Sequence, residues 1–124
     1  MTTAFWCVLV AALLPFVATV IAKRSGERFN NRDPRGWLEK QQGLARRANS
    51  AQANGFEAFP IFAAGVIIAH LAHAPQARID LLAISFVIVR IAFLVCFLAD
   101  WHWVRSLVWS IGLGLCIALF FAGA

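Results

Sequence analysis

Long apolar runs alternate with short polar connections along this chain. Four runs, at about residues 4–22, 54–71, 81–99 and 104–122, each approach the roughly 20 apolar residues that a helix needs to cross a bilayer. The first run is too long for a signal-peptide core and has no basic segment ahead of it, so we expect it to be retained as a span. The pattern predicts an all-α integral membrane four-helix bundle, with residues 1–124 as a single domain.

Composition excludes a soluble globular protein. Hydrophobic residues make up 61% of the 124 positions, mean hydropathy is +0.75, and 14% of the residues are charged, against roughly 25% in ordinary soluble domains. All three cysteines lie inside apolar runs, where a thiol packs as a small hydrophobic group. We therefore expect no disulfide framework.

Basic residues gather in one connection, which sets the predicted topology. The loop at residues 23–53 carries eight of the eleven basic residues and three of the six acids. Positive charge beside span ends stays in the cytoplasm, so this loop is predicted to be cytoplasmic and both termini to face outward. The charge excess thus reports membrane topology, and we expect no nucleic-acid partner. The basic residues of the loop are Lys23, Arg24, Arg28, Arg32, Arg35, Lys40, Arg46 and Arg47.

The two halves of this loop differ in composition. The stretch from Ser25 to Gly36 is rich in Gly, Asn, Asp and Pro, which predicts irregular structure. From Trp37 to Ala53 the residues are mostly strong helix formers, interrupted only by Gly43. This half predicts one helix that starts before the membrane and continues into the second span.

A few ionisable and amide side chains fall within the predicted spans. Arg90 lies near the middle of the third span, where a charge costs roughly 2.5 to 3.5 kcal/mol on insertion scales and needs a partner. Glu57 is the expected counter-charge. Helical spacing places Arg47, Ser50, Asn54 and Glu57 on one stripe. Two interpretations remain open: the stripe binds a ligand, or Glu57 and Arg90 form a buried ion pair that only fixes helix register.

Other chemical signatures are weak. His70 and His73 form an isolated pair, which is insufficient for a metal site, and we expect no bound metal. His70 is interpreted as an interfacial residue at the outer end of the second span. No glycine-rich phosphate loop or Cys-x-x-Cys motif occurs. A proton or ion carrier would need more intramembrane acids than Glu57 alone.

The combined pattern resembles the membrane-associated proteins in eicosanoid and glutathione metabolism, the MAPEG family. Asn54, Glu57 and Pro60 form an Asn-x-x-Glu-x-x-Pro pattern in the second span, and Arg90 follows in the third. The resemblance covers nearly the whole chain. The segment Asn31–Leu38 resembles the short bacterial members, which implies a bacterial inner membrane with periplasmic termini.

The resemblance implies a homotrimer that binds glutathione between protomers near the cytoplasmic face. Asn54 and Glu57 match glutathione contacts of the family's second helix, and Arg90 is a further candidate for binding. Arg105 matches the arginine that stabilises the glutathione thiolate in catalytic members. A fixed positive charge lowers the pKa of a thiol, ordinarily near 8.5, and so raises the population of the nucleophile.

Three positions depart from the catalytic pattern. Ser50 stands where catalytic relatives carry a glutathione-binding arginine, and Phe93 and Phe97 replace third-helix tyrosines. Arg47, one turn before Ser50, is a candidate to compensate. Two functions follow from the resemblance: a glutathione-dependent transferase or peroxidase acting on lipophilic substrates, or a non-catalytic member that serves as a structural or accessory subunit of a larger membrane complex.

Overall fold

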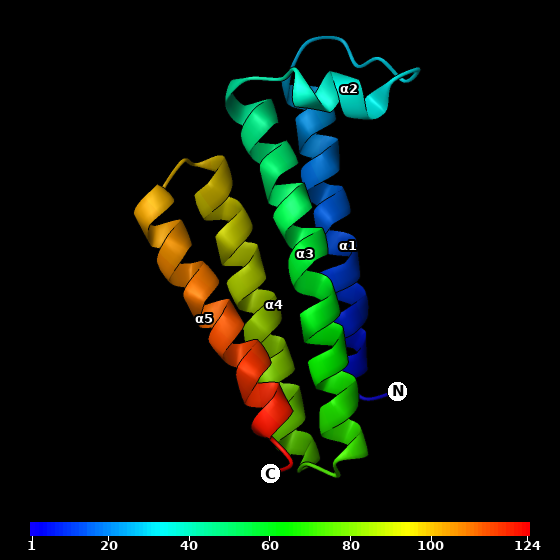
Figure 1. Ribbon diagram of the computed structural model, residues 1–124, viewed down its shortest axis with the longest axis vertical. Helices are drawn as coiled ribbons and strands as arrows, with labels where there is room; N and C mark the ends of the chain where they lie inside the picture. Colours follow the sequence, from blue (N-terminus) through cyan, green and yellow to red (C-terminus); the bar gives the residue numbers. More distant parts are fainter.

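The computed structural model describes residues 1–124 and is built from five helices. In chain order these are α1 (Thr3–Ser25), α2 (Pro34–Glu39), α3 (Gly43–Leu71), α4 (Gln76–Leu98) and α5 (His102–Phe121) (Figure 1). The four longer helices are long and apolar enough to cross a membrane. The predicted all-α bundle with four membrane helices is confirmed.

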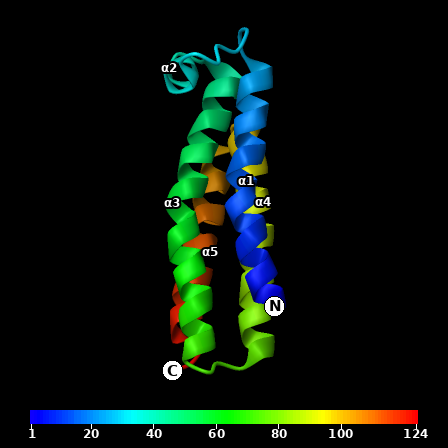
Figure 2. The ribbon, with the colours of Figure 1, turned by 90° about the vertical axis from the view of Figure 1, so that its right-hand side faces the viewer.

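The long helices run alternately up and down. Both termini lie at one end of the bundle, which we call the terminal end, and α2 lies across the other, the α2 end (Figure 1). The closest pairings are α1 with α3 and α4 with α5, while α5 packs on α3 as well (Figure 2). Helices α3, α4 and α5 therefore surround a common space, with α1 closing the far side of α3 and α4.

A stripe of small residues lets α1 approach its neighbours closely. Its buried positions recur every three or four residues, which keeps them on one face of the helix. Small side chains are favoured between membrane helices because they allow dense packing where lipid removes the hydrophobic driving force. On α3, Gly55 lies against the ring of Pro15. The buried stripe of α1 consists of Ala4, Cys7, Ala11, Pro15, Ala18 and Ala22.

Larger side chains fill the core toward the terminal end. The rings of Phe62 and Phe86 stack at a centroid distance of 4.0 Å, and Val66, Ile79 and Leu119 are fully buried beside them. This cluster joins α3, α4 and α5.

Polar contacts close the terminal end. Asp80 Oδ1 accepts a hydrogen bond from the backbone N–H of Ala4 at 2.9 Å, so a carboxylate stabilises the first turn of α1. The ring of His70 bonds Thr2 Oγ1 at 3.1 Å and the carbonyl of Val66 at 2.7 Å. His70 thus ties the start of α1 to the end of α3, in keeping with its interpretation as an end-of-span residue.

At the α2 end the prediction of one helix from Trp37 into the second span is wrong, because two separate helices form there. Asp33 accepts from the N–H of Gly36, and Pro34 occupies the first turn, so a separate short helix starts there. It ends at Glu39, and α3 begins only at Gly43, whose φ of +60° turns the chain. The irregular segment is accordingly shorter than predicted and stops before Pro34.

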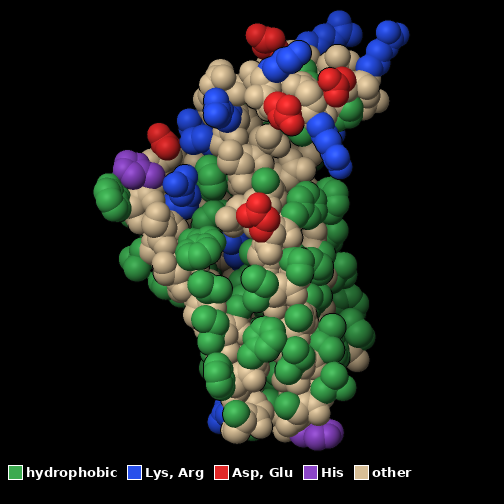
Figure 3. Space-filling model, in the orientation of Figure 1, with side chains coloured by type: hydrophobic (Ala, Val, Ile, Leu, Met, Phe, Trp, Pro, Cys, Tyr) green, Lys and Arg blue, Asp and Glu red, His purple; other side chains and the backbone are tan.

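Charge is segregated along the long axis. Lys and Arg side chains gather around the α2 end, while apolar side chains cover most of the rest of the face in view (Figure 3). Trp101, just before α5, and Trp103, in its first turn, are exposed near the α2 end, where aromatic residues mark a membrane interface. An apolar belt bounded by a basic end is the surface expected of an integral membrane protein.

Gly55 is expected to be required for the contact between α1 and α3. A Cβ added there would lie 2.8 Å from Cγ of Pro15, a rigid ring that cannot move aside cheaply. We expect Gly55→Ala to lower the free energy of unfolding by about 1 to 3 kcal/mol, through overpacking. Thermal unfolding in detergent measures this. The matched control is Gly114→Ala, where a Cβ meets nothing within 4 Å; equal midpoints for the two variants would contradict the proposed role of Gly55.

Candidate functional site

Two adjoining cavities open between α3, α4 and α5. The first has a volume of about 180 Å³ and is lined by residues of all three helices, among them Glu57 and Arg90. The second, nearer the turn between α4 and α5, has a volume of about 460 Å³ and is lined by Phe97 and Arg105. Asn54 and Trp109 line both cavities. The two spaces therefore meet beside these two side chains.

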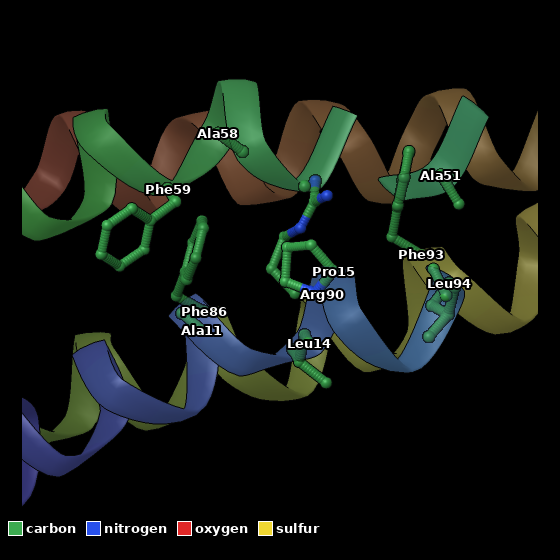
Figure 4. Close-up of a pocket in the computed structure, with 12 residues that line it drawn as sticks. Ala11, Leu14, Pro15, Ala51, Ala58, Phe59, Phe86, Arg90, Phe93 and Leu94 are labelled. Carbon is green, nitrogen blue, oxygen red and sulfur yellow. The ribbon is translucent and has the colours of Figure 1, made fainter. Parts of the chain in front are cut away.

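Arg90 is held between α4 and α3. Its side chain rises from α4 toward α3 and is flanked by Phe86 and Phe93 (Figure 4). Nη2 donates a hydrogen bond to Asn54 Oδ1 at 2.9 Å, and Cζ lies 4.3 Å from the centroid of the Phe93 ring. A charge-assisted hydrogen bond and a cation–π contact together provide the environment that lipid cannot.

The predicted pairing of Arg90 with Glu57 is wrong within the protomer. Asn54 is the side chain that meets the guanidinium, while Glu57, three residues further along α3, is exposed. Three residues turn the helix by roughly 300°, so two residues of one stripe need not both face the same neighbour. Glu57 still lines the first cavity, as an exposed residue.

Arg105 takes up an analogous position at the α2 end. Its Cζ lies 4.4 Å from the centroid of the Phe97 ring, and the rings of Phe93 and Phe97 pack edge to face at 5.5 Å. Two arginines and two phenylalanines thus form a row along the two adjoining cavities, which together we call the cleft. The sequence marks both phenylalanines as lost hydroxyls, and their spacing three and seven residues after Arg90 indicates that they share its helix face.

Arg47 and Ser50 lie outside the two cavities. Nε and Nη2 of Arg47 donate to the carbonyl of Leu98 at 3.2 and 3.1 Å, so its guanidinium caps the end of α4. Ser50 is exposed on α3. The structure brings together Asn54, Glu57, Arg90 and Arg105, and it does not bring Arg47 to them.

The lining determines what the cleft can hold. Two guanidinium groups, an amide and one carboxylate suit a small molecule that carries more than one anionic group together with a cation. No group of three or more His, Cys, Asp or Glu side chains could hold a metal ion. Sequence reasoning missed Trp109 and Cys116, which line the cleft from α5, because neither residue is unusual within an apolar run.

Comparison with known proteins agrees with this architecture. No curated protein and no solved structure matches the chain. The family model described as the MAPEG family matches residues 3–124, which include all four membrane helices and every residue that lines the two cavities. The chain therefore belongs to the MAPEG family, as an integral membrane protein.

Proposed function

We propose that the protein is a glutathione-dependent transferase or peroxidase that acts on lipophilic substrates. The observation that supports this best is the convergence of Arg90, Arg105, Asn54 and Glu57 on adjoining cavities. Glutathione carries two carboxylates, one ammonium group, two amides and a thiol. Glu57 complements the ammonium group, and the two arginines complement one carboxylate and the thiolate.

Some side chains of the cleft bind glutathione, and one activates its thiol. Glu57, an exposed residue of the first cavity, pairs with the ammonium group of glutathione. Arg90 pairs with a carboxylate through the N–H groups that Asn54 does not engage, and the Asn54 amide holds the peptide. Arg105 lies beside the sulfur and lowers the pKa of the thiol by stabilising the thiolate. In this scheme Arg47, the other candidate for binding, keeps α4 in place.

In the transferase reaction the thiolate sulfur forms a bond to an electrophilic carbon. The leaving group departs with its electron pair, and the thiol proton passes to solvent. In the peroxidase reaction the sulfur attacks a hydroperoxide oxygen, the O–O bond breaks to release an alcohol, and a second glutathione yields the disulfide and water. Either second substrate enters from the bilayer, since apolar side chains line much of the first cavity.

We propose further that the protein is a homotrimer whose α2 end faces the cytoplasm. Exposed residues of α3 and α5 line the first cavity, and exposed residues of α5 line the second, so a neighbouring protomer of a homotrimer would close them. The basic α2 end faces the cytoplasm by the positive-inside rule, which places the termini in the periplasm of a bacterial inner membrane. Glutathione then reaches the wider cavity from the cytoplasm.

An accessory role is the second candidate. The hydrogen bond from Arg90 to Asn54 and the stacking of each arginine on a phenylalanine give both guanidinium groups a partner within the protomer without any ligand. A non-catalytic subunit of a larger membrane complex needs only such internal pairing. Glutathione binding separates the two candidates.

Reduced glutathione is expected to raise the thermal unfolding midpoint of the detergent-solubilised protein in a saturable way. A ligand that binds only the folded state stabilises it by about 2.7 kcal/mol at a hundredfold excess over Kd. Glu57→Gln removes the partner of the ammonium group, and loss of a charged hydrogen bond weakens binding by roughly 1.5 to 3 kcal/mol. The shift should therefore move to at least tenfold higher concentration.

Arg47→Ala is the control for this measurement, because Arg47 is an arginine of the same helix outside the cavities. It should keep the parent's dependence on glutathione concentration. Absence of any shift at millimolar glutathione would favour the accessory role. A shift lost in Arg47→Ala and kept in Glu57→Gln would reverse the assignment of these two residues.

Removal of the Arg105 charge is expected to shift the pH dependence of turnover. With the guanidinium gone, the bound thiol returns toward its ordinary pKa near 8.5, and each unit of increase above 7 lowers the thiolate population at pH 7 by up to about tenfold. Arg105→Gln should thus lose activity toward a lipophilic electrophile at pH 7 and regain it as pH rises. Activity that stays low at every pH would mean that Arg105 acts in some other way.

Crosslinking in mild detergent is expected to give a trimer as the largest discrete species. The exposed carboxylate of Glu57 and the open cavity walls on α3 and α5 then lie at the contact between protomers. A protein that remains monomeric under crosslinking would contradict the proposed assembly while leaving the glutathione measurement to decide the function.

A further inference from the structure

The net charge of the chain lies entirely at the α2 end. The segment from Lys23 to Arg47 carries eight basic and three acidic side chains, an excess of five that equals the net charge of +5 of the whole chain. The other residues carry three side chains of each sign. Arg46 and Arg47 donate their hydrogen bonds to an amide and to a backbone carbonyl, neither of which is an anion. Five positive charges thus have no counter-charge within the protomer.

Two helix ends bring part of this charge to the edge of the apolar belt. Lys23 and Arg24 lie in the last turn of α1, directly after the buried Ala22. Arg46 lies in the first turn of α3, two residues before the buried Ala48, and Ala22 and Ala48 belong to one buried cluster. The three cations therefore lie at one level of the bundle. We call Lys23, Arg24 and Arg46 the basic collar.

The basic collar lies at the depth of lipid headgroups. A helix rises roughly 1.5 Å per residue, so Lys23 and Arg24 are within about 3 Å of the last apolar residue of α1 along its axis. The headgroup layer on each side of a bilayer is roughly 5 to 7 Å thick. The phosphate groups of lipids beside α1 are therefore within reach of these side chains.

Helix α2 covers this level from the side of the solvent. It reaches sideways past α1 (Figure 1), and a basic side chain lies below this overhang, next to the apolar side chains of the belt (Figure 3). Trp37 and Leu38 are buried against the ends of α1 and α3. The Trp37 Nε1–H donates to the Arg28 carbonyl at 2.9 Å, and Lys23 Nζ lies 4.4 Å from the centroid of the Phe29 ring. These contacts fold the loop against the collar.

We propose that the basic collar binds the phosphate groups of anionic phospholipids in the leaflet at the α2 end. A headgroup such as phosphatidylglycerol brings a net negative charge to cations that the protomer leaves without a counter-charge. Each Lys or Arg near an anionic lipid surface strengthens the attraction by roughly fivefold. A phosphatidylcholine headgroup carries its own cation, which opposes the collar. The bound lipid fixes the α2 end against the membrane surface.

Native mass spectrometry of the protein in detergent micelles with equal amounts of dioleoyl phosphatidylglycerol and dioleoyl phosphatidylcholine tests this proposal. In the parent we expect complexes with phosphatidylglycerol to exceed those with phosphatidylcholine by at least about fivefold. Arg24→Gln combined with Arg46→Gln should reduce this ratio to about twofold or less. Both side chains are exposed, and the hydrogen bond of Arg46 goes to the exposed Gln42 side chain, so the fold should persist.

Arg32→Gln combined with Arg35→Gln is the matched control, because it removes two exposed positive charges from the same segment. Arg35 precedes the buried Trp37 by two residues, which turns its side chain by roughly 200° to the opposite face of α2, away from the bundle. This variant should keep the parent's lipid ratio to within about twofold.

A parent protein that binds the two lipids equally overturns the proposal. An equal loss of preference in the two double variants, or a loss confined to the control, also overturns it, because the collar would then not be the site. Should the double variant at Arg24 and Arg46 fail to assemble, Arg24→Gln alone is compared with Arg35→Gln in the same way. Glutathione binding is a separate measurement, and neither result depends on the other.

Discussion

A guanidinium group within a membrane bundle must find its hydrogen-bond and charge partners in the protein, because lipid tails offer none. In this chain Arg90 meets that requirement across a helix interface, with Asn54 Oδ1 at 2.9 Å and the Phe93 ring at 4.3 Å. The hydrogen bond fixes how α3 and α4 face one another. The position of both cavities follows from it, since Asn54 lines each of them.

Phenylalanine at positions 93 and 97 gives the cleft a distinct character. A ring face attracts a guanidinium through its quadrupole but occupies none of its N–H groups. Arg90 and Arg105 are therefore positioned by Phe93 and Phe97 while their remaining donors stay available to an anion. A tyrosine hydroxyl would add a hydrogen bond to a ligand; the phenylalanines instead hold the two charges in place, so their loss of hydroxyls does not by itself remove an anion site.

The sequence predicted the spans, and it predicted that Arg90 would be partnered, because both follow from the solvent properties of the bilayer. It misidentified the partner, since packing between the helices, which no local pattern encodes, decides whether Asn54 or Glu57 faces α4. Asp33 and Pro34 are a local signal for the start of the separate helix α2. The run of helix formers from Trp37 onward instead favours one long helix. Arg47 caps Leu98, a contact set by tertiary packing that no local pattern encodes.

One end of the first cavity is lined by apolar side chains, and an empty space there has an energetic cost. Water occupies a protein cavity stably when it finds two to four polar partners, and the side chains there, Phe86, Leu113 and Cys116 among them, offer few. A dry space sacrifices dispersion contacts along its walls, and membrane helices depend on such contacts because lipid removes the hydrophobic drive to associate. One longer side chain at Gly112 would recover them. A glycine at this position therefore trades bundle stability for space beside Phe86.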